Sequence, residues 1–197
     1  MLFKEPINLN LKDADVVYYP DFFNAELSNY YFKTLIKNIE WQQDTITLFG
    51  KTHLQPRLTA LYANNNLPYS YSNIIMYPKT FNQELAQIKE TIEKLLNVSF
   101  TSCLANLYRN GKDSNGWHAD DEKELGQHPI IASVTFGMER IFHLKHKYEP
   151  IHKAKIRLQN GSLFVMKGNT QKYWLHQLPK THKDIGERIN LTFRIIT

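Results

Sequence analysis

The spacing of hydrophobic residues changes along the chain from the period of a helix to the period of a strand. Leu27, Tyr31 and Leu35 recur every four residues. They predict an amphipathic helix over residues 25–39, with Asn24 as its N-cap.

A second helix is predicted after Thr80, because Thr80 and Gln83 have the spacing of a capping box. Apolar residues then keep the helical period as far as Asn97, at Leu85, Ile88, Ile92, Leu95 and Leu96. Both helices present one apolar face, so we expect them to pack against the rest of the protein.

From about Ser99 onward, apolar and polar residues alternate in short stretches separated by turn residues, which is typical of half-buried strands. The predicted strands are residues 105–108, 130–136, 140–145, 154–158, 162–166, 174–178 and 188–196. Helices followed by strands predict an α+β fold. Its core is an antiparallel sandwich or jelly roll, with packing helices on the N-terminal side.

Composition indicates an ordinary globular protein. The 197 residues weigh 23.2 kDa and are 42% hydrophobic and 22% charged, which predicts one domain over residues 1–197. No run of 18 apolar residues occurs, and Lys4, Glu5 and Pro6 interrupt the N-terminus, so we expect neither a membrane span nor a signal peptide. Cys103 is the single cysteine, which excludes an internal disulfide and fits a reducing cytoplasm, or the nucleus of a eukaryote.

Positive charge is concentrated in the second half. The formal net charge is +5, and residues 140–183 carry ten Lys or Arg against one acid, Glu149. Aromatic residues make up 13% of the chain. Positive charge together with aromatic residues is typical of a protein that binds nucleic acid. A basic surface exposed only to solvent is the equally simple alternative.

His118 and Asp120 are two residues apart, so on an extended chain both side chains point to one side, about 6.6 Å apart. That spacing permits both to bind one metal ion, but with eight His and eight Asp in 197 residues the pair alone is weak. His176, in another predicted strand, can complete a set of two histidines and one carboxylate, as in non-haem iron oxygenases. An ordinary hydrogen-bonded histidine remains the alternative for each of them.

The last predicted strand has one apolar face and one face with two guanidinium groups. The polar face consists of Arg188, Asn190, Thr192 and Arg194. Guanidinium groups match carboxylates, and the two arginines are about 20 Å apart along a strand, so each would bind a different end of a dicarboxylate. Asn106 and Tyr108 can add neutral donors. An edge strand in water would show the same alternation.

Together these residues resemble the AlkB family of Fe(II)/2-oxoglutarate dioxygenases, closest to its eukaryotic-type DNA-repair branch. The resemblance covers roughly residues 13–197. Its motifs are Asn106-Leu107-Tyr108, His118-x-Asp120-Asp121-Glu122, His176 and Arg188-x-Asn190-Leu191-Thr192-Phe193-Arg194. It implies a double-stranded β-helix as the catalytic core over residues 99–197, with helical support and nucleotide-recognition hairpins over residues 1–98.

The resemblance also implies a cofactor arrangement. His118, Asp120 and His176 would hold Fe(II). Arg188, Tyr108 and Asn190 would take the distal carboxylate of 2-oxoglutarate. Asn106 and Arg194 would lie near its iron-chelating end, with Thr192 on the same face. With O2 as co-substrate, 2-oxoglutarate becomes succinate and carbon dioxide, and an N-methyl group on a base is hydroxylated and lost as formaldehyde.

A base inside a duplex must be extruded to reach such a site. Residues 45–51 predict a hairpin whose tip, Phe49 beside Lys51, resembles an intercalating finger, although Phe49 packed inward is an alternative. Three further groups of residues would contact the substrate. Tyr69, Tyr71 and Ser72 match positions that line the base pocket, Asp121 and Glu122 would accept hydrogen bonds from the exocyclic amine, and Lys51, Arg57 and the basic stretch would hold phosphates.

The predicted function is oxidative demethylation of 1-methyladenine and 3-methylcytosine in DNA by a monomeric enzyme. The same chemistry on RNA or tRNA, and a nucleic-acid-binding protein with a degenerate site, are the alternatives. A zinc hydrolase would leave Arg188 and Arg194 unexplained. Residues 145–157 form a shorter loop than in duplex-specific relatives, so the preference for double-stranded or single-stranded substrate stays open.

Overall fold

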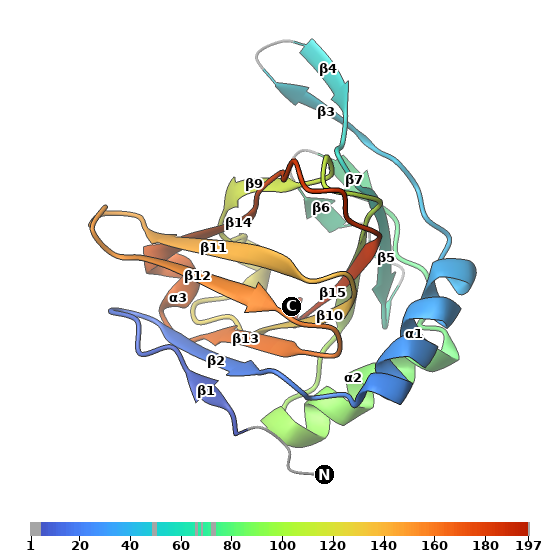
Figure 1. Cartoon of the computed structure of the whole chain (residues 1–197), viewed down its shortest axis with the longest axis horizontal. Coiled ribbons are helices and arrows are strands. Elements are labelled where there is room, and N and C mark those ends of the chain that lie inside the picture. The colour runs from blue at the N-terminus through green and yellow to red at the C-terminus, as the bar shows by residue number, and fades with distance from the viewer. Residues whose placement is uncertain (1–4, 49–50, 66, 68, 72–73, 197) are drawn as a thin grey trace.

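Two antiparallel sheets stacked face to face form the body of the protein (Figure 1). The computed structural model describes residues 5–48, 51–65, 67, 69–71 and 74–196. The larger sheet has, in spatial order, the strands β1 (Ile7–Asn8), β2 (Asp15–Tyr19), β13 (Leu163–Lys167), β10 (Ile131–Gly137), β15 (Arg188–Arg194), β8 (Ser102–Tyr108) and β5 (Leu58–Ala63). The smaller sheet has the order β12 (Lys153–Leu158), β11 (Arg140–His146), β14 (Trp174–Leu178) and β9 (Asn115–His118).

Helices cover the outer face of the larger sheet. Helices α1 (Ala25–Asn38) and α2 (Gln83–Leu96) place Leu35 and Ile88 in one buried cluster with Phe136 and Phe193 of the sheet. A second cluster fills the space between the sheets, for example Phe164 against Leu144 and Trp174. A short helix, α3 (Thr170–Tyr173), connects β13 to β14, and a 3-10 turn occupies Lys123–Leu125. This packing confirms the predicted α+β jelly-roll class with packing helices.

The predicted elements agree closely with the observed ones. Helix α1 begins after Asn24, whose side chain accepts the Leu27 N–H, as predicted. Helix α2 begins later than predicted, because Asn82 rather than Thr80 is the N-cap and accepts the Leu85 N–H. The predicted capping box is therefore wrong.

Strands β1, β2, β5 and β9 were not predicted. Strand β5 is almost entirely buried and apolar, so it lacks the alternation that marks a half-exposed strand. It pairs with β8 through six residue pairs, and this contact brings part of the first hundred residues into the larger sheet. Residues on both sides of position 98 thus build one continuous sheet.

Two hairpins lie in the upper part of the molecule in Figure 1, and one of them, β3–β4, projects beyond the sheets. Strands β3 (Thr45–Leu48) and β4 (Lys51–Leu54) pair with Leu48 opposite Lys51, so the predicted hairpin is confirmed. Strands β6 (Tyr69–Tyr71) and β7 (Ile74–Met76) form the other. The predicted substrate contacts Phe49 and Ser72 lie outside the described residues.

Within the described part of the chain, no helix is long and apolar enough to cross a membrane.

Candidate metal and cofactor site

The three predicted metal ligands meet between the two sheets. His118 ends β9 and lies directly opposite His176 of β14 in the strand pairing, and Asp120 follows β9 by two residues. One ligand atom from each of the three side chains lies within 4.8 Å of the others. Two histidines and one carboxylate in this arrangement fit an iron ion with open positions for other ligands.

The hydrogen bonds of His118 select its metal-binding nitrogen. Nδ1 lies 2.8 Å from the Gly116 carbonyl oxygen, which can only accept, so Nδ1 carries the proton. Nε2 therefore keeps its lone pair, and the Asn115 side-chain amide donates to it at 3.3 Å. A backbone carbonyl that holds the other ring nitrogen is the usual support of a metal-binding histidine.

Charge at this site is suited to a divalent cation. Burial, and then the neighbouring His118, lower the pKa of His176 to about 3, so this ring is neutral at physiological pH. Burial acts to raise the pKa of Asp120, but Arg194 and the two histidines outweigh it and hold that pKa below its usual range. Burial also lowers the pKa of His118, so the site presents two neutral imidazoles and one ionised carboxylate, the forms that bind metal.

His176 also makes the metal-free protein sensitive to acid. Below pH 6.5 the His176 side chain becomes protonated in the unfolded chain. In the folded protein the same side chain stays neutral down to about pH 3. Between pH 6 and pH 4 we expect the free energy of unfolding to lose about 2–3 kcal/mol from His176. Urea unfolding at both pH values measures this loss, which should be absent in His176→Gln and unchanged in His182→Gln, an exposed control.

Asp120 is held by two neighbours besides the histidines. Arg194 Nη2 donates to Asp120 Oδ1 at 2.7 Å, and both side chains are buried. The Asp120 backbone N–H donates to Gln171 Oε1 at 2.9 Å. Gln171, on α3, is 1% exposed and was not predicted, because an ordinary glutamine in a polar stretch carries no sequence signal. It fixes the backbone that carries the carboxylate.

We expect Gln171→Met, which keeps the side-chain size but removes the acceptor, to weaken Fe(II) binding about tenfold, the lower end of the effect of outer-shell partners. Anaerobic calorimetric titration measures the affinity. Gln177→Met on the outer side of β14 is the matched control. Equal affinities of the two variants would show that the Gln171 contact is only structural.

The other end of the cavity holds an arginine that lacks a full set of partners. Arg188 is 2% exposed, and its Nη2 donates to Thr135 Oγ1 at 2.8 Å while its guanidinium lies 5.3 Å from the centre of the Tyr108 ring. Its Nε finds no hydrogen-bond acceptor among the described residues. Burial lowers the pKa of Arg188 to about 10. A buried cation with an unused donor fits an incoming carboxylate.

One cavity joins Arg188 to the metal ligands. Its walls include Asn106, Tyr108, Asn190, Thr192 and Arg194, all predicted as cofactor contacts. Asn190 donates to Ser133 Oγ at 2.7 Å and to the Val134 carbonyl at 3.2 Å, so its amide is already oriented. With Arg188 and Arg194 at opposite ends of β15, the residues fit a dicarboxylate such as 2-oxoglutarate.

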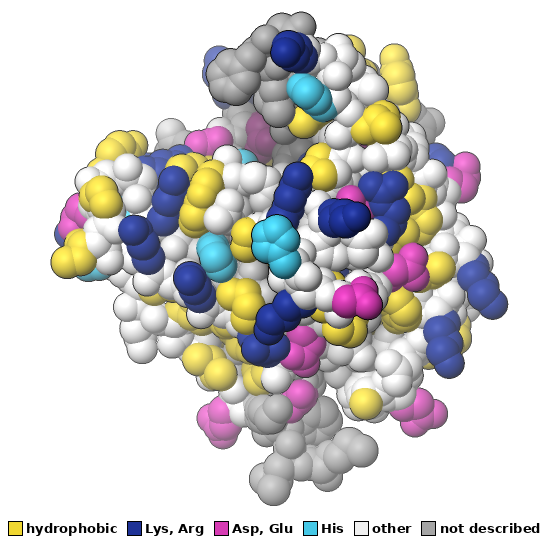
Figure 2. All heavy atoms as spheres, turned by 45° about the horizontal axis from the view of Figure 1, so that its top comes forward, with side chains coloured by type: hydrophobic (Ala, Val, Ile, Leu, Met, Phe, Trp, Pro, Cys, Tyr) yellow, Lys and Arg dark blue, Asp and Glu magenta, His cyan; other side chains and the backbone are white. Residues whose placement is uncertain are grey.

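Two predicted phosphate contacts are wrong. Arg57 is only 4% exposed, and its Nε donates to Asn106 Oδ1 at 2.9 Å, so it supports the wall of the cofactor cavity. Arg140, part of the basic stretch, is 5% exposed and donates to the carbonyl oxygens of Asn110, Asp113 and Pro179. Other Lys and Arg side chains are scattered over the face shown in Figure 2.

The predicted base contacts divide into three groups. Tyr69 and Tyr71 lie on strand β6, and their side chains are not described. Glu122 Oε2 is buried without a hydrogen-bond partner among the described residues, and burial followed by the charge of Asp120 raises the Glu122 pKa. Asp121 instead forms an ion pair with Lys147 at 2.9 Å. Lys51, which was predicted as a phosphate contact and not as a base contact, is exposed on β4.

Sequence comparisons place these features in a known family. The family model of the 2OG-Fe(II) oxygenase superfamily matches residues 15–194. The chain is 41% identical over 186 residues to the Bos taurus protein "Alpha-ketoglutarate-dependent dioxygenase alkB homolog 3", covering 90% of this chain and 64% of the relative. It is 38% identical over 209 residues to "DNA oxidative demethylase ALKBH2" of Arabidopsis thaliana, covering 93% and 67%.

The chain thus spans less than two thirds of the length of the bovine relative. The Mus musculus protein "DNA oxidative demethylase ALKBH2" is 33% identical over 175 residues, covering 84% of this chain and 73% of the relative. The solved structure of OsALKBH1 superimposes with a TM-score of 0.68 over 97% of this chain and all of that chain, at 14% identity, a likeness of fold. The chain belongs to the AlkB family within the 2OG-Fe(II) oxygenase superfamily, which implies Fe(II) and 2-oxoglutarate as its cofactors.

Proposed function

We propose that the protein demethylates N-alkylated bases in DNA, such as 1-methyladenine and 3-methylcytosine, with 2-oxoglutarate and O2 as co-substrates. The observation that carries the proposal is the single cavity that joins the three metal ligands to the unsatisfied Arg188 guanidinium. Two of the relatives are named DNA oxidative demethylases. We propose residues 1–197 as one catalytic domain.

The cofactor contacts follow from the cavity. His118, Asp120 and His176 would hold Fe(II), and Arg188 would bind the distal carboxylate of 2-oxoglutarate. Arg194, which donates to Asp120, would lie near the other end. When bound, Fe(II) and 2-oxoglutarate would activate O2, which supplies the oxygen atom that converts an N–CH3 group into N–CH2OH, and 2-oxoglutarate would become succinate and carbon dioxide. The adduct then loses formaldehyde and leaves N–H on the base.

Glu122 would be the main polar contact of the substrate base. Its unsatisfied Oε2 would accept a hydrogen bond from the exocyclic amine of the base, and its negative charge would favour a cationic methylated ring. Tyr71 and His118 would stack on the two faces of the flipped base. Phe49, between β3 and β4, would fill the gap in the stack, with Lys51 on a phosphate.

The test is an anaerobic titration with Fe(II) and 2-oxoglutarate, followed by air and mass spectrometry of methylated oligonucleotides. We expect one equivalent of each cofactor to bind and the mass to fall by one methylene per lesion. Single-stranded and duplex DNA and RNA of the same sequence are compared in parallel. Faster turnover of RNA would reassign the substrate, and failure to bind either cofactor would indicate a degenerate site.

A further inference from the structure

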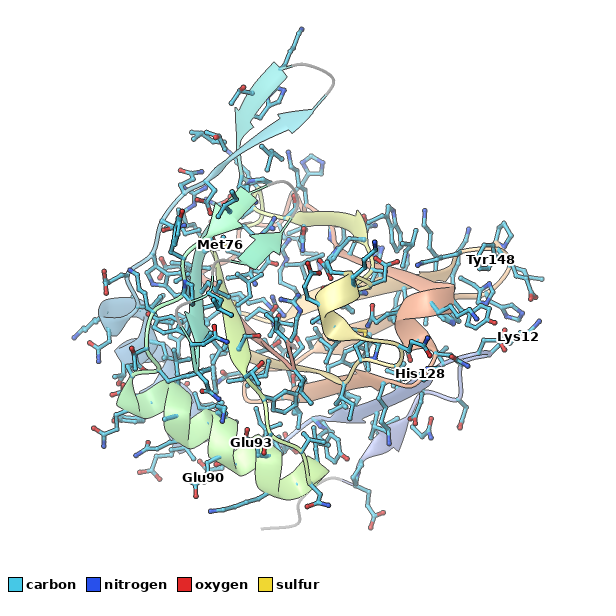
Figure 3. The ribbon with its side chains drawn as sticks, turned by 180° about the vertical axis from the view of Figure 1, so that it is seen from behind. Lys12, Met76, Glu90, Glu93, His128 and Tyr148 are labelled. Atoms are coloured by element: carbon cyan, nitrogen blue, oxygen red, sulfur yellow. The ribbon has the colours of Figure 1, made fainter. Side chains whose placement is uncertain are left out.

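A second cavity lies behind the metal site, and we call it the side groove. It is formed by residues 126–129, 147–148, 168–169 and 171–172 together with Asp121, and its volume of about 560 Å³ is that of a typical small-molecule site. In the view from behind, His128 and Tyr148 lie on the same side of the molecule (Figure 3). No residue of the side groove belongs to the proposed cofactor contacts.

One side chain connects the side groove with two residues that line the cofactor cavity. Gln171 lines the groove, and its Oε1 accepts the N–H of Asp120 at 2.9 Å. Its Nε2 lies 3.5 Å from Sδ of Met166, a residue that lines the cofactor cavity. Gln171 and Asp121 of the groove both adjoin the metal ligand Asp120, so a ligand in the side groove would lie near the metal site.

The charged groups of the side groove suit a phosphate. Lys147 Nζ donates to Asp121 Oδ2 and to the Gln171 carbonyl, both at 2.9 Å, which uses two of its three N–H donors. Lys172 is exposed, and its Nζ lies 5.2 Å from the centre of the Tyr173 ring. Asp121, the acid of the groove, is already neutralised by Lys147, so Lys172 and the third donor of Lys147 remain for an anion.

An exposed aromatic ring lines the same groove as these lysines. Tyr148 is 69% exposed, and its ring centre lies 6.2 Å from that of Tyr173. The backbone N–H groups of Tyr148 and Glu149 both donate to His146 Nδ1, at 3.3 and 3.0 Å, which holds the turn in place. An aromatic ring and two lysines that line one groove are the side chains that bind a base and its phosphate.

The same hydrogen bonds exclude metal binding next to the side groove. Asp13, His146 and Glu149 have ligand atoms close enough to hold a metal ion. Because Nδ1 of His146 accepts two N–H groups, the proton of the neutral ring must sit on Nε2, which faces Asp13 Oδ2 at 3.5 Å. A protonated nitrogen cannot bind a metal, so this cluster anchors the turn that carries Tyr148.

We propose that the side groove binds the nucleotide next to the modified one on the same strand. Its base stacks on Tyr148 and its phosphate lies between Lys147 and Lys172. This proposal rests on the proposed function, since it names how that substrate continues beyond the cofactor cavity. It makes a methylated dinucleotide the smallest good substrate.

The test compares 1-methyl-dAMP with two dinucleotides that carry one extra nucleotide, on the 5′ or on the 3′ side. With the Fe(II)- and 2-oxoglutarate-loaded protein, we expect one dinucleotide to have a KM about tenfold below that of the mononucleotide, the gain expected from one stacked base. Tyr148→Ala and Lys172→Met should each remove most of this gain, and Tyr148→Phe should retain it. Tyr30→Ala on α1 and Lys94→Met on α2 are the matched controls.

A second measurement does not depend on turnover. With 2-aminopurine as the extra base and no O2 present, stacking on Tyr148 should quench its fluorescence on binding, and Tyr148→Ala should abolish the quenching. If both dinucleotides equal the mononucleotide while longer oligonucleotides are demethylated, the side-groove proposal is wrong and the proposed function stands. If cofactors bind but no methylated substrate reacts, the proposed function itself is wrong.

Discussion

Replacing His118 with alanine is expected to abolish 2-oxoglutarate-dependent demethylation and to weaken Fe(II) binding by more than about 100-fold, since even outer-shell partners contribute 10–100-fold. His118 is one of three ligands, and its Nε2 is held ready by the hydrogen bond from Nδ1 to the Gly116 carbonyl. The measurements are anaerobic Fe(II) titration and mass spectrometry of a methylated oligonucleotide.

The control for this variant is His182→Ala, because His182 is exposed and lies outside the cavity. Thermal unfolding of both variants checks that the fold is intact. If His118→Ala keeps demethylating with 2-oxoglutarate, the metal site is elsewhere and the assigned chemistry is wrong.

Replacing Arg188 with methionine is expected to weaken 2-oxoglutarate binding about 100-fold or more, because truncating one partner of a buried charge pair costs about 2–5 kcal/mol. The guanidinium is buried, its Nε has no acceptor among the described residues, and the Tyr108 ring supports its face. Fluorescence or calorimetric titration of 2-oxoglutarate at saturating Fe(II) measures the effect. Arg188→Lys keeps the charge but loses the planar guanidinium group, so its affinity for 2-oxoglutarate should lie between those of the unaltered protein and Arg188→Met.

The same substitution is expected to stabilise the cofactor-free protein. The Arg188 pKa of about 10, against an ordinary 12.5, means that folding disfavours the charged form by about 3 kcal/mol at neutral pH. Replacing a buried ion by an apolar side chain of similar size commonly gains about 1–4 kcal/mol. Thermal unfolding without cofactor should therefore show a higher midpoint for Arg188→Met.

These two opposite effects separate a binding role from a structural one. If Arg188 served only to stabilise the fold, replacing it would lower the stability of the protein, and the affinity for the cofactor would fall as a result. Arg157→Met serves as the control, because Arg157 is an exposed arginine whose described ion pair, with Glu139, is long at 3.6 Å. Unchanged 2-oxoglutarate affinity in Arg188→Met would contradict the cofactor assignment.

Most local features were predictable because they depend on neighbours in sequence. Helix α1 follows from its period and from Asn24, whose capping bond spans three residues. Strand β15 follows from strict alternation along its length. The cap of α2 was misplaced because Thr80 and Asn82 are both good N-caps, and only the folded chain shows which side chain accepts the N–H.

Burial was the property that the sequence did not reveal. Arg57 and Arg140 look like surface cations in the sequence, yet both are buried and hydrogen-bonded to groups distant along the chain. The buried strand β5 has no alternation, and Gln171 reaches Asp120 across 51 positions. Contacts of this kind depend on which segments pack together.

The sequence by itself determined the two long helices, all strands after residue 99 except β9, and the residue types of a metal and dicarboxylate site, because period and side-chain chemistry are local properties. The tertiary structure alone decided that β9 and β14 place His118 opposite His176, that Gln171 holds Asp120 and that a groove opens behind it. Strand pairing and packing join residues that are far apart in the chain, and no local pattern contains that information.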